Sequence, residues 1–206
     1  MKPLDQLGQI DRTVATATRD GAATKVVTLA QTYPVGLADL WHACTSGERI
    51  SRWLMPVTGD LRLGGRYQLE GNAGGTVQEC DPKRRLAVTW EFGGEVSWVV
   101  ATFTGDVQSA TLHVEHTAHV DQERWEQYGP GAVGIGWDSM LLGLALHLGS
   151  GESLDHAAAM EWTASDEGRE FMARSGAAWR EAQIASGEDE ASARAAAERC
   201  LAAYTG

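Results

Sequence analysis

The feature that most constrains the fold is a series of six short apolar segments within residues 57–120. Turn-forming pairs such as Asp81-Pro82 and Gly93-Gly94 separate the segments. Connections of two to five residues are too short for a parallel crossover and are typical of β-hairpins. The pattern therefore predicts an antiparallel meander of six strands, at residues 57–63, 65–71, 75–80, 85–92, 96–104 and 110–120.

The segments on either side of the meander complete an α+β order of elements. Residues 24–33 predict another strand, and residues 35–45 and 48–54 predict two short helices. Residues 136–149 predict a longer helix with one continuous apolar stripe. An antiparallel sheet with one polar face must bury its other face on something, and this stripe is the longest one available. We therefore expect the sheet to curl around the helix at 136–149.

The two ends of the chain differ from this central part in composition. Residues 1–23 are polar and rich in Thr and Ala, which predicts a loosely attached N-terminal arm. Residues 151–206 are rich in Ala and Glu and predict a helical C-terminal extension. The expected domain organisation is an arm at 1–23, a compact domain at 24–150 and an extension at 151–206. The extension could pack on the domain or on a second copy, so a homodimer is one possibility.

Charge and cysteine content exclude several classes of protein. The 28 acidic and 17 basic residues give a net charge of -11, which repels nucleic acid and anionic membrane surfaces. Cys44, Cys80 and Cys200 are far apart, so a disulfide framework or a thiolate metal site is not expected. No signal peptide is evident, and the apolar stretch at 140–148 is half the length of a membrane span. A cytoplasmic protein is the expectation.

Strand alternation predicts which side chains face the core. Leu112, Val114 and His116 share the apolar face of their strand, and Glu79 shares a face with Val77. The same rule places Trp98 on the outer face. It also predicts that further residues face inward, namely Tyr67, Leu69, Leu86, Val88, Trp90, Phe92, Val99, Ala101 and Phe103.

An inward His116 and an inward Glu79 are unusual, because an unpaired buried charge is costly. Three interpretations stay open: the two side chains contact each other, each has another partner, or both face a wet cavity that takes a polar ligand. A satisfied buried histidine and a carboxylate at the sheet edge would need no function at all.

Two further motifs suggest functions that their context does not support. Residues 129–134 match GxGxxG, but a dinucleotide site needs a parallel βαβ unit, and a meander precedes this segment. His113, His116 and His119 alternate between the two faces of a strand, so they cannot converge on a metal ion. We expect no metal and no cofactor, and no catalytic set can be recognised.

An ordered set of short motifs resembles the START-like (SRPBCC) superfamily. The branch it resembles is that of the C-terminal domain of activators of the heat-shock protein 90 ATPase, over residues 24–150. The resemblance implies a helix-grip (START/Bet v-like) fold, in which a curved antiparallel sheet wraps around a long C-terminal helix and encloses a cavity. The motifs are Pro34 with Leu40-Trp41, Trp53 before Pro56, Asp60 to Tyr67, Gly75 to Pro82, Leu86 to Glu91, Thr111 to His116, and Gly136-Trp137 with the leucine stripe.

Members of that superfamily bind hydrophobic or amphipathic small molecules, and some are cyclases or hydrolases. The resemblance therefore implies a small-molecule binding protein with a site between helix and sheet. One alternative is a cyclase or hydrolase in which His116 is the general acid or base. The other is a co-chaperone-like interaction protein that uses Trp98 and the acidic tail. The residues expected to line the site are Trp41, Trp53, Tyr67, Glu79, Trp90, Val99, Phe103, His116, Trp137, Leu141 and Leu144.

Overall fold

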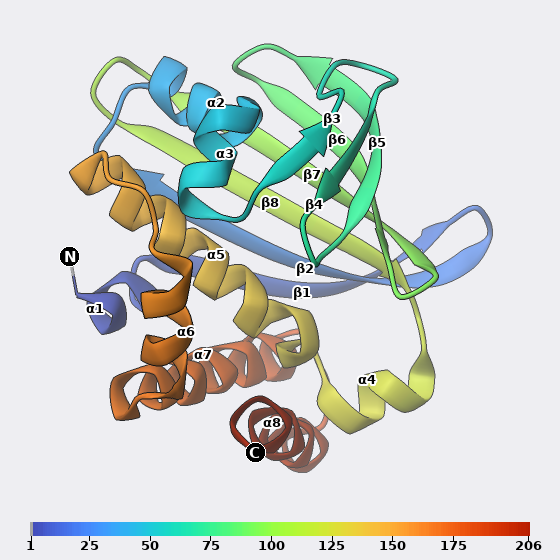
Figure 1. The fold of residues 1–206 in the computed structure, drawn as a ribbon. Coiled ribbons are helices and arrows are strands. Elements are labelled where there is room, and N and C mark those ends of the chain that lie inside the picture. Colours follow the sequence, from blue (N-terminus) through green and yellow to red (C-terminus); the bar gives the residue numbers. More distant parts are fainter. Residues whose placement is uncertain (1) are drawn as a thin grey trace. The chain divides into compact units, whose positions relative to one another are not determined.

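The computed structural model describes residues 2–206 and confirms the α+β class. Its strands form one eight-stranded sheet in the order β1-β2-β8-β7-β6-β5-β4-β3 (Figure 1). The elements in chain order are α1 (Pro3–Leu7), β1 (Ile10–Arg19), β2 (Ala22–Tyr33), α2 (Leu37–Thr45), α3 (Gly47–Trp53), β3 (Val57–Gly59), β4 (Arg66–Leu69), β5 (Gly74–Asp81), β6 (Arg85–Phe92), β7 (Glu95–Gly105), β8 (Ala110–His119), α4 (Gln122–Tyr128), α5 (Gly131–Ser150), α6 (His156–Ala164), α7 (Asp166–Ala185) and α8 (Glu190–Thr205).

The chain divides into two compact units that are interleaved in the sequence. Unit 1 consists of Met1–Val27, His119–Leu142 and Asp155–Gly206. Unit 2 consists of Thr28–Ala118 and Gly143–Leu154. Helix α5 therefore contributes its first part to unit 1 and its last part to unit 2. The domain limits expected after residues 23 and 150 stay predictions.

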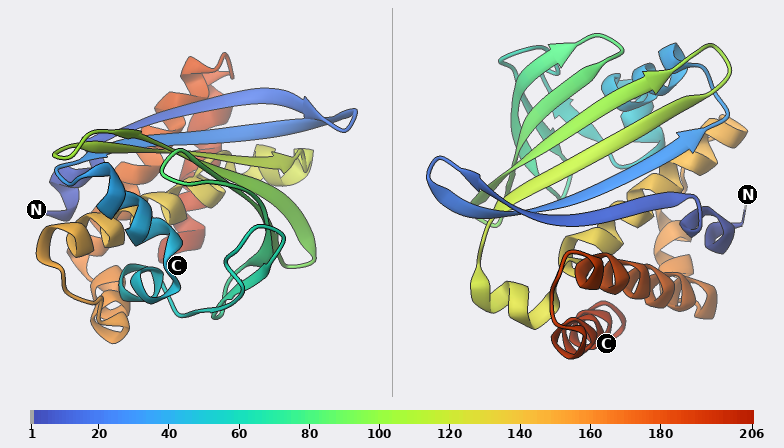
Figure 2. Two further views of the ribbon diagram at one scale, coloured as in Figure 1. Left: turned by 90° about the horizontal axis from the view of Figure 1, so that it is seen from above. Right: turned by 180° about the vertical axis from the view of Figure 1, so that it is seen from behind.

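The six-strand meander predicted for unit 2 is confirmed. Each neighbouring pair from β3 to β8 is antiparallel, and the connections are short turns. Figure 2 shows β6, β7 and β8 side by side in the view from behind. The register places Val88 opposite Val99 and Val99 opposite His116, so these three side chains lie on one face. We call it the inner face, and the opposite side of the same strands the outer face.

One irregularity in β5 changes the predicted alternation. The pairing between β5 and β6 shifts between Val77 and Glu79, which marks a β-bulge. Val77 pairs with Val88 on the inner face, whereas Glu79 pairs with Ala87 on the outer face. The prediction that Glu79 points inward with Val77 is therefore wrong. The extra residue of the bulge inverts the orientation of every side chain that follows it in the strand.

Helices α2 and α3 pack within unit 2 through their tryptophans. The ring of Trp41 on α2 meets that of Phe103 on β7 edge to face, with ring centroids 5.0 Å apart. Trp53 on α3 is buried and donates its indole N–H to the carbonyl of Ala43 over 2.9 Å. The end of α5 also contacts α3, because a Cβ added at Gly143 would lie 2.5 Å from the Trp53 carbonyl oxygen.

A buried charge network organises unit 1. Asp138 on α5 has a side chain that is 0% exposed, and it forms an ion pair with Arg12 of β1 at 3.1 Å. Ser175 and Trp179 on α7 donate hydrogen bonds to the same carboxylate over 2.5 and 3.2 Å. The prediction of a loosely attached N-terminal arm is wrong, because residues 3–19 form α1 and β1 and Arg12 is held in this network.

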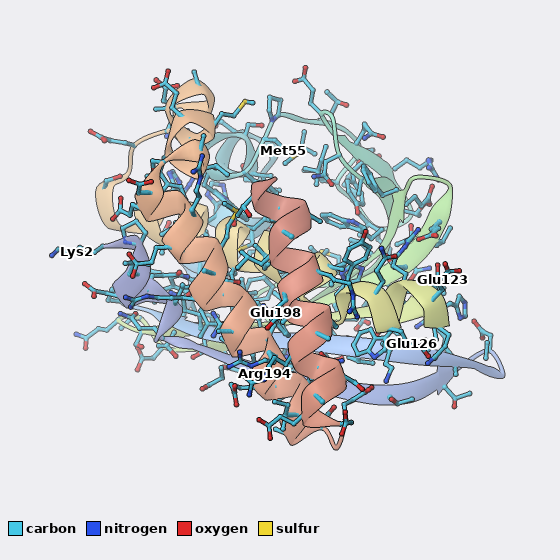
Figure 3. The ribbon with its side chains drawn as sticks, turned by 90° about the horizontal axis from the view of Figure 1, so that it is seen from below. Lys2, Met55, Glu123, Glu126, Arg194 and Glu198 are labelled. Atoms are coloured by element: carbon cyan, nitrogen blue, oxygen red, sulfur yellow. The ribbon has the colours of Figure 1, made fainter. Side chains whose placement is uncertain are left out.

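The helical character predicted for residues 151–206 is confirmed, and α7 and α8 form a helical hairpin in unit 1. Figure 3 shows α7 and α8 side by side, with Arg194 and Glu198 labelled on α8. Ser165 and Asp189 cap the starts of these helices by accepting backbone N–H groups. Arg199 on α8 donates to the Glu126 carbonyl over 2.7 Å, which joins α8 to α4. Helices α4 and α6 were not expected from the sequence.

The glycines of the GxGxxG segment serve close packing in unit 1. Gly129 adopts a φ of 57° at the end of α4, and α5 begins at Gly131, five residues before the predicted start. A Cβ at Gly134 would lie 2.3 Å from the Trp179 ring, so this position of α5 requires glycine.

Helix α5 is long and apolar enough to cross a membrane by length and composition alone. Its most apolar 18-residue window has a mean hydropathy of 1.3, and 56% of that window is buried inside the protein. This burial agrees with a core helix of a soluble domain.

Candidate functional site

His116 is the polar centre of the inner face of unit 2. The alternation of β8 places it after Leu112 and Val114 on the same side, and the residue is 7% exposed. Its Nε2 lies 2.8 Å from the hydroxyl of Ser97 on β7. Its ring centroid is 6.2 Å from that of Trp90 on β6, which is half-buried. Three neighbouring strands thus bring a histidine, a hydroxyl and an indole together.

The hydrogen bonds of Ser97 show which atom carries the proton in its contact with His116. The Ser97 hydroxyl donates to the carbonyl oxygen of Trp90 over 3.1 Å. A hydroxyl has one proton to donate, so the His116 Nε2–H is the donor to Ser97. Burial lowers the pKa of His116 from 6.5 to about 4, so the imidazole is neutral at pH 7. His116 and Ser97 therefore form an uncharged polar pair.

Apart from Trp137, the aromatic residues predicted for the site lie on this face or on the helices of unit 2. Tyr67 on β4 is buried and donates its hydroxyl to the Thr89 carbonyl over 2.8 Å. Burial, with a smaller contribution from Glu91, raises the pKa of Tyr67, which stays protonated. Trp41 packs on Phe103, and Val99 lies directly opposite His116.

Glu79 does not belong to this group. Its carboxylate receives a hydrogen bond from Arg85 at 2.9 Å on the outer face, and its side chain is 48% exposed. The interpretation in which His116 and Glu79 contact each other is therefore wrong. The polar partner of His116 is Ser97.

The remaining predicted residues are divided between the two units. Trp53 and Leu144 are buried in unit 2. Trp137 and Leu141 lie in the part of α5 that belongs to unit 1, and their place in the site stays a prediction. His113 lies opposite Thr102 on the outer face, away from His116. Among the residues that the structure describes, no group of three or more His, Cys, Asp or Glu side chains could hold a metal ion.

The inner face becomes more exposed toward the β6–β7 hairpin. Val99 is buried, Trp90 is half-buried and Phe92, at the end of β6, is 60% exposed. Phe92 lies on the inner face as alternation predicts, but it is exposed because the strand ends there, before Gly93-Gly94. Exposure of the apolar side chains on this face therefore increases from the neighbourhood of the His116–Ser97 pair toward the hairpin.

Comparison with known proteins agrees with this fold. The sequence profile of the family described as "Activator of Hsp90 ATPase homolog 1-like protein" matches residues 34–149. The chain belongs to this family. Among curated proteins, no sequence matches the chain.

Solved structures similar to this member of the family share its fold. CalU16 from Micromonospora echinospora is 27% identical in its crystal structure, with a TM-score of 0.67, and the match covers 84% of this chain and 97% of CalU16. The solution structure of CalU16 gives 28% identity and a TM-score of 0.70, over 86% and 96% of the two chains. A conserved protein of unknown function from Enterococcus faecalis, EF2215, is 10% identical with a TM-score of 0.59, over 87% and 93%.

The family match and these structures confirm the START-like helix-grip fold that the sequence motifs indicated. This fold is of a type associated with small hydrophobic ligands.

Proposed function

We propose that this protein binds a hydrophobic or amphipathic small molecule on the inner face of unit 2. The observation that supports the proposal best is the neutral His116–Ser97 pair, which lies beside the half-buried Trp90 on an otherwise apolar face. Small-molecule sites typically combine aromatic walls with a few polar groups that orient the ligand. The graded exposure from Val99 to Phe92 gives such a ligand a route of entry.

The polar pair is difficult to explain by packing alone. A valine or leucine at position 116 would continue the apolar row of Leu112 and Val114 without any polar group to satisfy. A histidine kept neutral by burial costs native stability in mild acid, because the unfolded chain binds the proton more readily. A ligand that uses the pair would compensate for this cost.

Matched tryptophan variants test the proposal. Trp90 lies on the inner face, whereas Trp98 is half-buried on the outer face of the adjacent strand, opposite Thr89. We expect Trp90→Leu to weaken binding of neutral naphthalene and anthracene derivatives at least about tenfold, and Trp98→Leu to leave it unchanged. Equilibrium dialysis measures the affinities, and native mass spectrometry of the purified protein detects a copurified ligand. Equal losses in both variants would contradict the proposed location.

The hydrolase alternative has one observation in its favour, the 2.8 Å contact between Ser97 and His116. A serine nucleophile must donate its proton to the histidine. Here the Ser97 hydroxyl donates to the Trp90 carbonyl, and the lowered pKa of His116 makes it a weak base. Ester turnover that is lost in both Ser97→Ala and His116→Gln would restore this alternative.

A cytoplasmic location forms part of the proposal. Cys44, Cys80 and Cys200 are free thiols, which suits a reducing compartment. The co-chaperone-like alternative remains a prediction, and stoichiometric recovery of a chaperone with the purified protein would support it.

A further inference from the structure

We propose that the ligand of the inner face is uncharged: an aromatic molecule with a hydroxyl group, and neither a carboxylate nor an ammonium ion. This inference rests on the proposed function and specifies the ligand class of the same site.

The first argument is the distribution of charge over the two faces of the meander. Charged side chains of the central strands pair with one another on the outer face, as in Arg66 with Glu91 at 2.8 Å and Arg85 with Glu79 at 2.9 Å. From β4 to β8, the inner face as described carries, apart from His116, one side chain of the Asp, Glu, Lys and Arg types, Glu95, at the exposed end of β7. A buried ion needs a counterion, and this face provides none near His116.

The second argument is the state of the polar pair itself. The His116 Nε2–H donates to Ser97, and Ser97 donates to a main-chain carbonyl. Both groups are therefore used as neutral donors and acceptors. The Ser97 oxygen keeps one lone pair that can accept a hydrogen bond from a ligand hydroxyl, whereas a ligand carbonyl or carboxylate would need a donor, and the protons of both groups are already engaged.

The third argument is the charge at the exposed end of the face. Glu95 pairs with Phe92 across the β6–β7 hairpin, so a carboxylate stands beside the apolar row. The protein as a whole carries a net charge of -11. This net charge disfavours the approach of an anion.

Three probes of one shape test the inference with the full-length protein: naphthalen-2-ol, naphthalene-2-sulfonate and naphthalen-2-ylmethylammonium. Equilibrium dialysis at pH 7 gives each dissociation constant. We expect naphthalen-2-ol to bind at least about tenfold more tightly than either ion, because neither ion finds a counterion on the face. An ion that binds as tightly as the naphthol would overturn this inference and leave the proposed function intact. Failure of all three probes to bind would overturn both.

A gain-of-function variant provides an independent check. Ser97 is half-buried, so in Ser97→Lys the long side chain could keep its ammonium near the rim while its stem covers the face. We expect this variant to bind naphthalene-2-sulfonate at least about tenfold more tightly than the wild type does, whereas Trp98→Lys on the outer face leaves the affinity unchanged. Circular dichroism confirms that both variants are folded. An unchanged sulfonate affinity in folded Ser97→Lys would count against the inference.

Discussion

Replacing His116 by glutamine should remove a specific pH dependence of stability. Glutamine does not titrate between pH 4 and 7, and its amide can still donate to Ser97. In the native protein burial lowers the pKa of His116 from 6.5 to about 4, while the unfolded chain keeps the ordinary value. Below pH 6.5 the unfolded state therefore binds a proton that the native state does not bind. The stability associated with His116 is complete above pH 6.5 and is lost as the pH falls toward 4.

The size of this effect follows from the pKa difference. Lowering the pKa of His116 from 6.5 to about 4, at about 1.4 kcal/mol for each tenfold change in proton affinity, corresponds to a total loss of about 3 kcal/mol. At pH 5 the loss should already be about 2 kcal/mol. A loss of this size is a large fraction of the stability of an ordinary domain.

Urea unfolding between pH 7.5 and 4.5 measures the free energy of unfolding for the wild type and for His116→Gln. Their difference should change by about 2 kcal/mol between pH 7 and 5, with the wild type losing more. Ser97→Ala is the control, because it removes the hydrogen-bond partner and keeps the titrating group, so its pH slope should follow that of the wild type. Parallel curves for the wild type and His116→Gln would refute the buried, neutral state of the imidazole.

Three further predictions concern packing and charge elsewhere in the molecule. Arg12→Met should destabilise the protein by about 3 kcal/mol because it leaves the buried Asp138 carboxylate without its cation, whereas the Arg12→Met/Asp138→Leu double variant should recover most of that loss in a double-mutant cycle. Gly143→Ala should cost about 1–2 kcal/mol, since its methyl group would meet a main-chain oxygen of α3, whereas Gly149→Ala, which has open space, should gain up to about 1 kcal/mol in thermal unfolding. Glu79→Gln should change stability by less than about 1 kcal/mol and leave ligand binding unaffected, since its ion pair with Arg85 is exposed to solvent.

The sequence predicted the fold well where the pattern is repeated and local. Alternation over β8 correctly placed Leu112, Val114 and His116 on one face, and turn residues separated the strands of the meander. Alternation gave the wrong face for Glu79, because a bulge in β5 adds one residue and moves the side chains after it to the opposite face of the sheet. No turn residue in the sequence marks this bulge.

The polar partners were harder to predict than the strands. Ser97 is a small residue at an ordinary strand position, and only the register between β7 and β8 places it next to His116. In the same way, Arg12 looked like one polar residue in a polar segment. Its role depends on Asp138, which follows it by 126 residues and which no local pattern connects to it.

The interleaved sequence of unit 1 has a consequence for how the protein is made. Lys25 pairs with Glu188, 163 positions later. Strands β1 and β2 are therefore synthesised long before the C-terminal residues that contact them, and these contacts can form only when translation is nearly complete. A fragment limited to the family match, residues 34–149, would lack Arg12, Ser175 and Trp179. Its Asp138 carboxylate would then have lost all three of these donors. Such fragments should misfold or need chaperone rescue, even though they contain every strand of the meander.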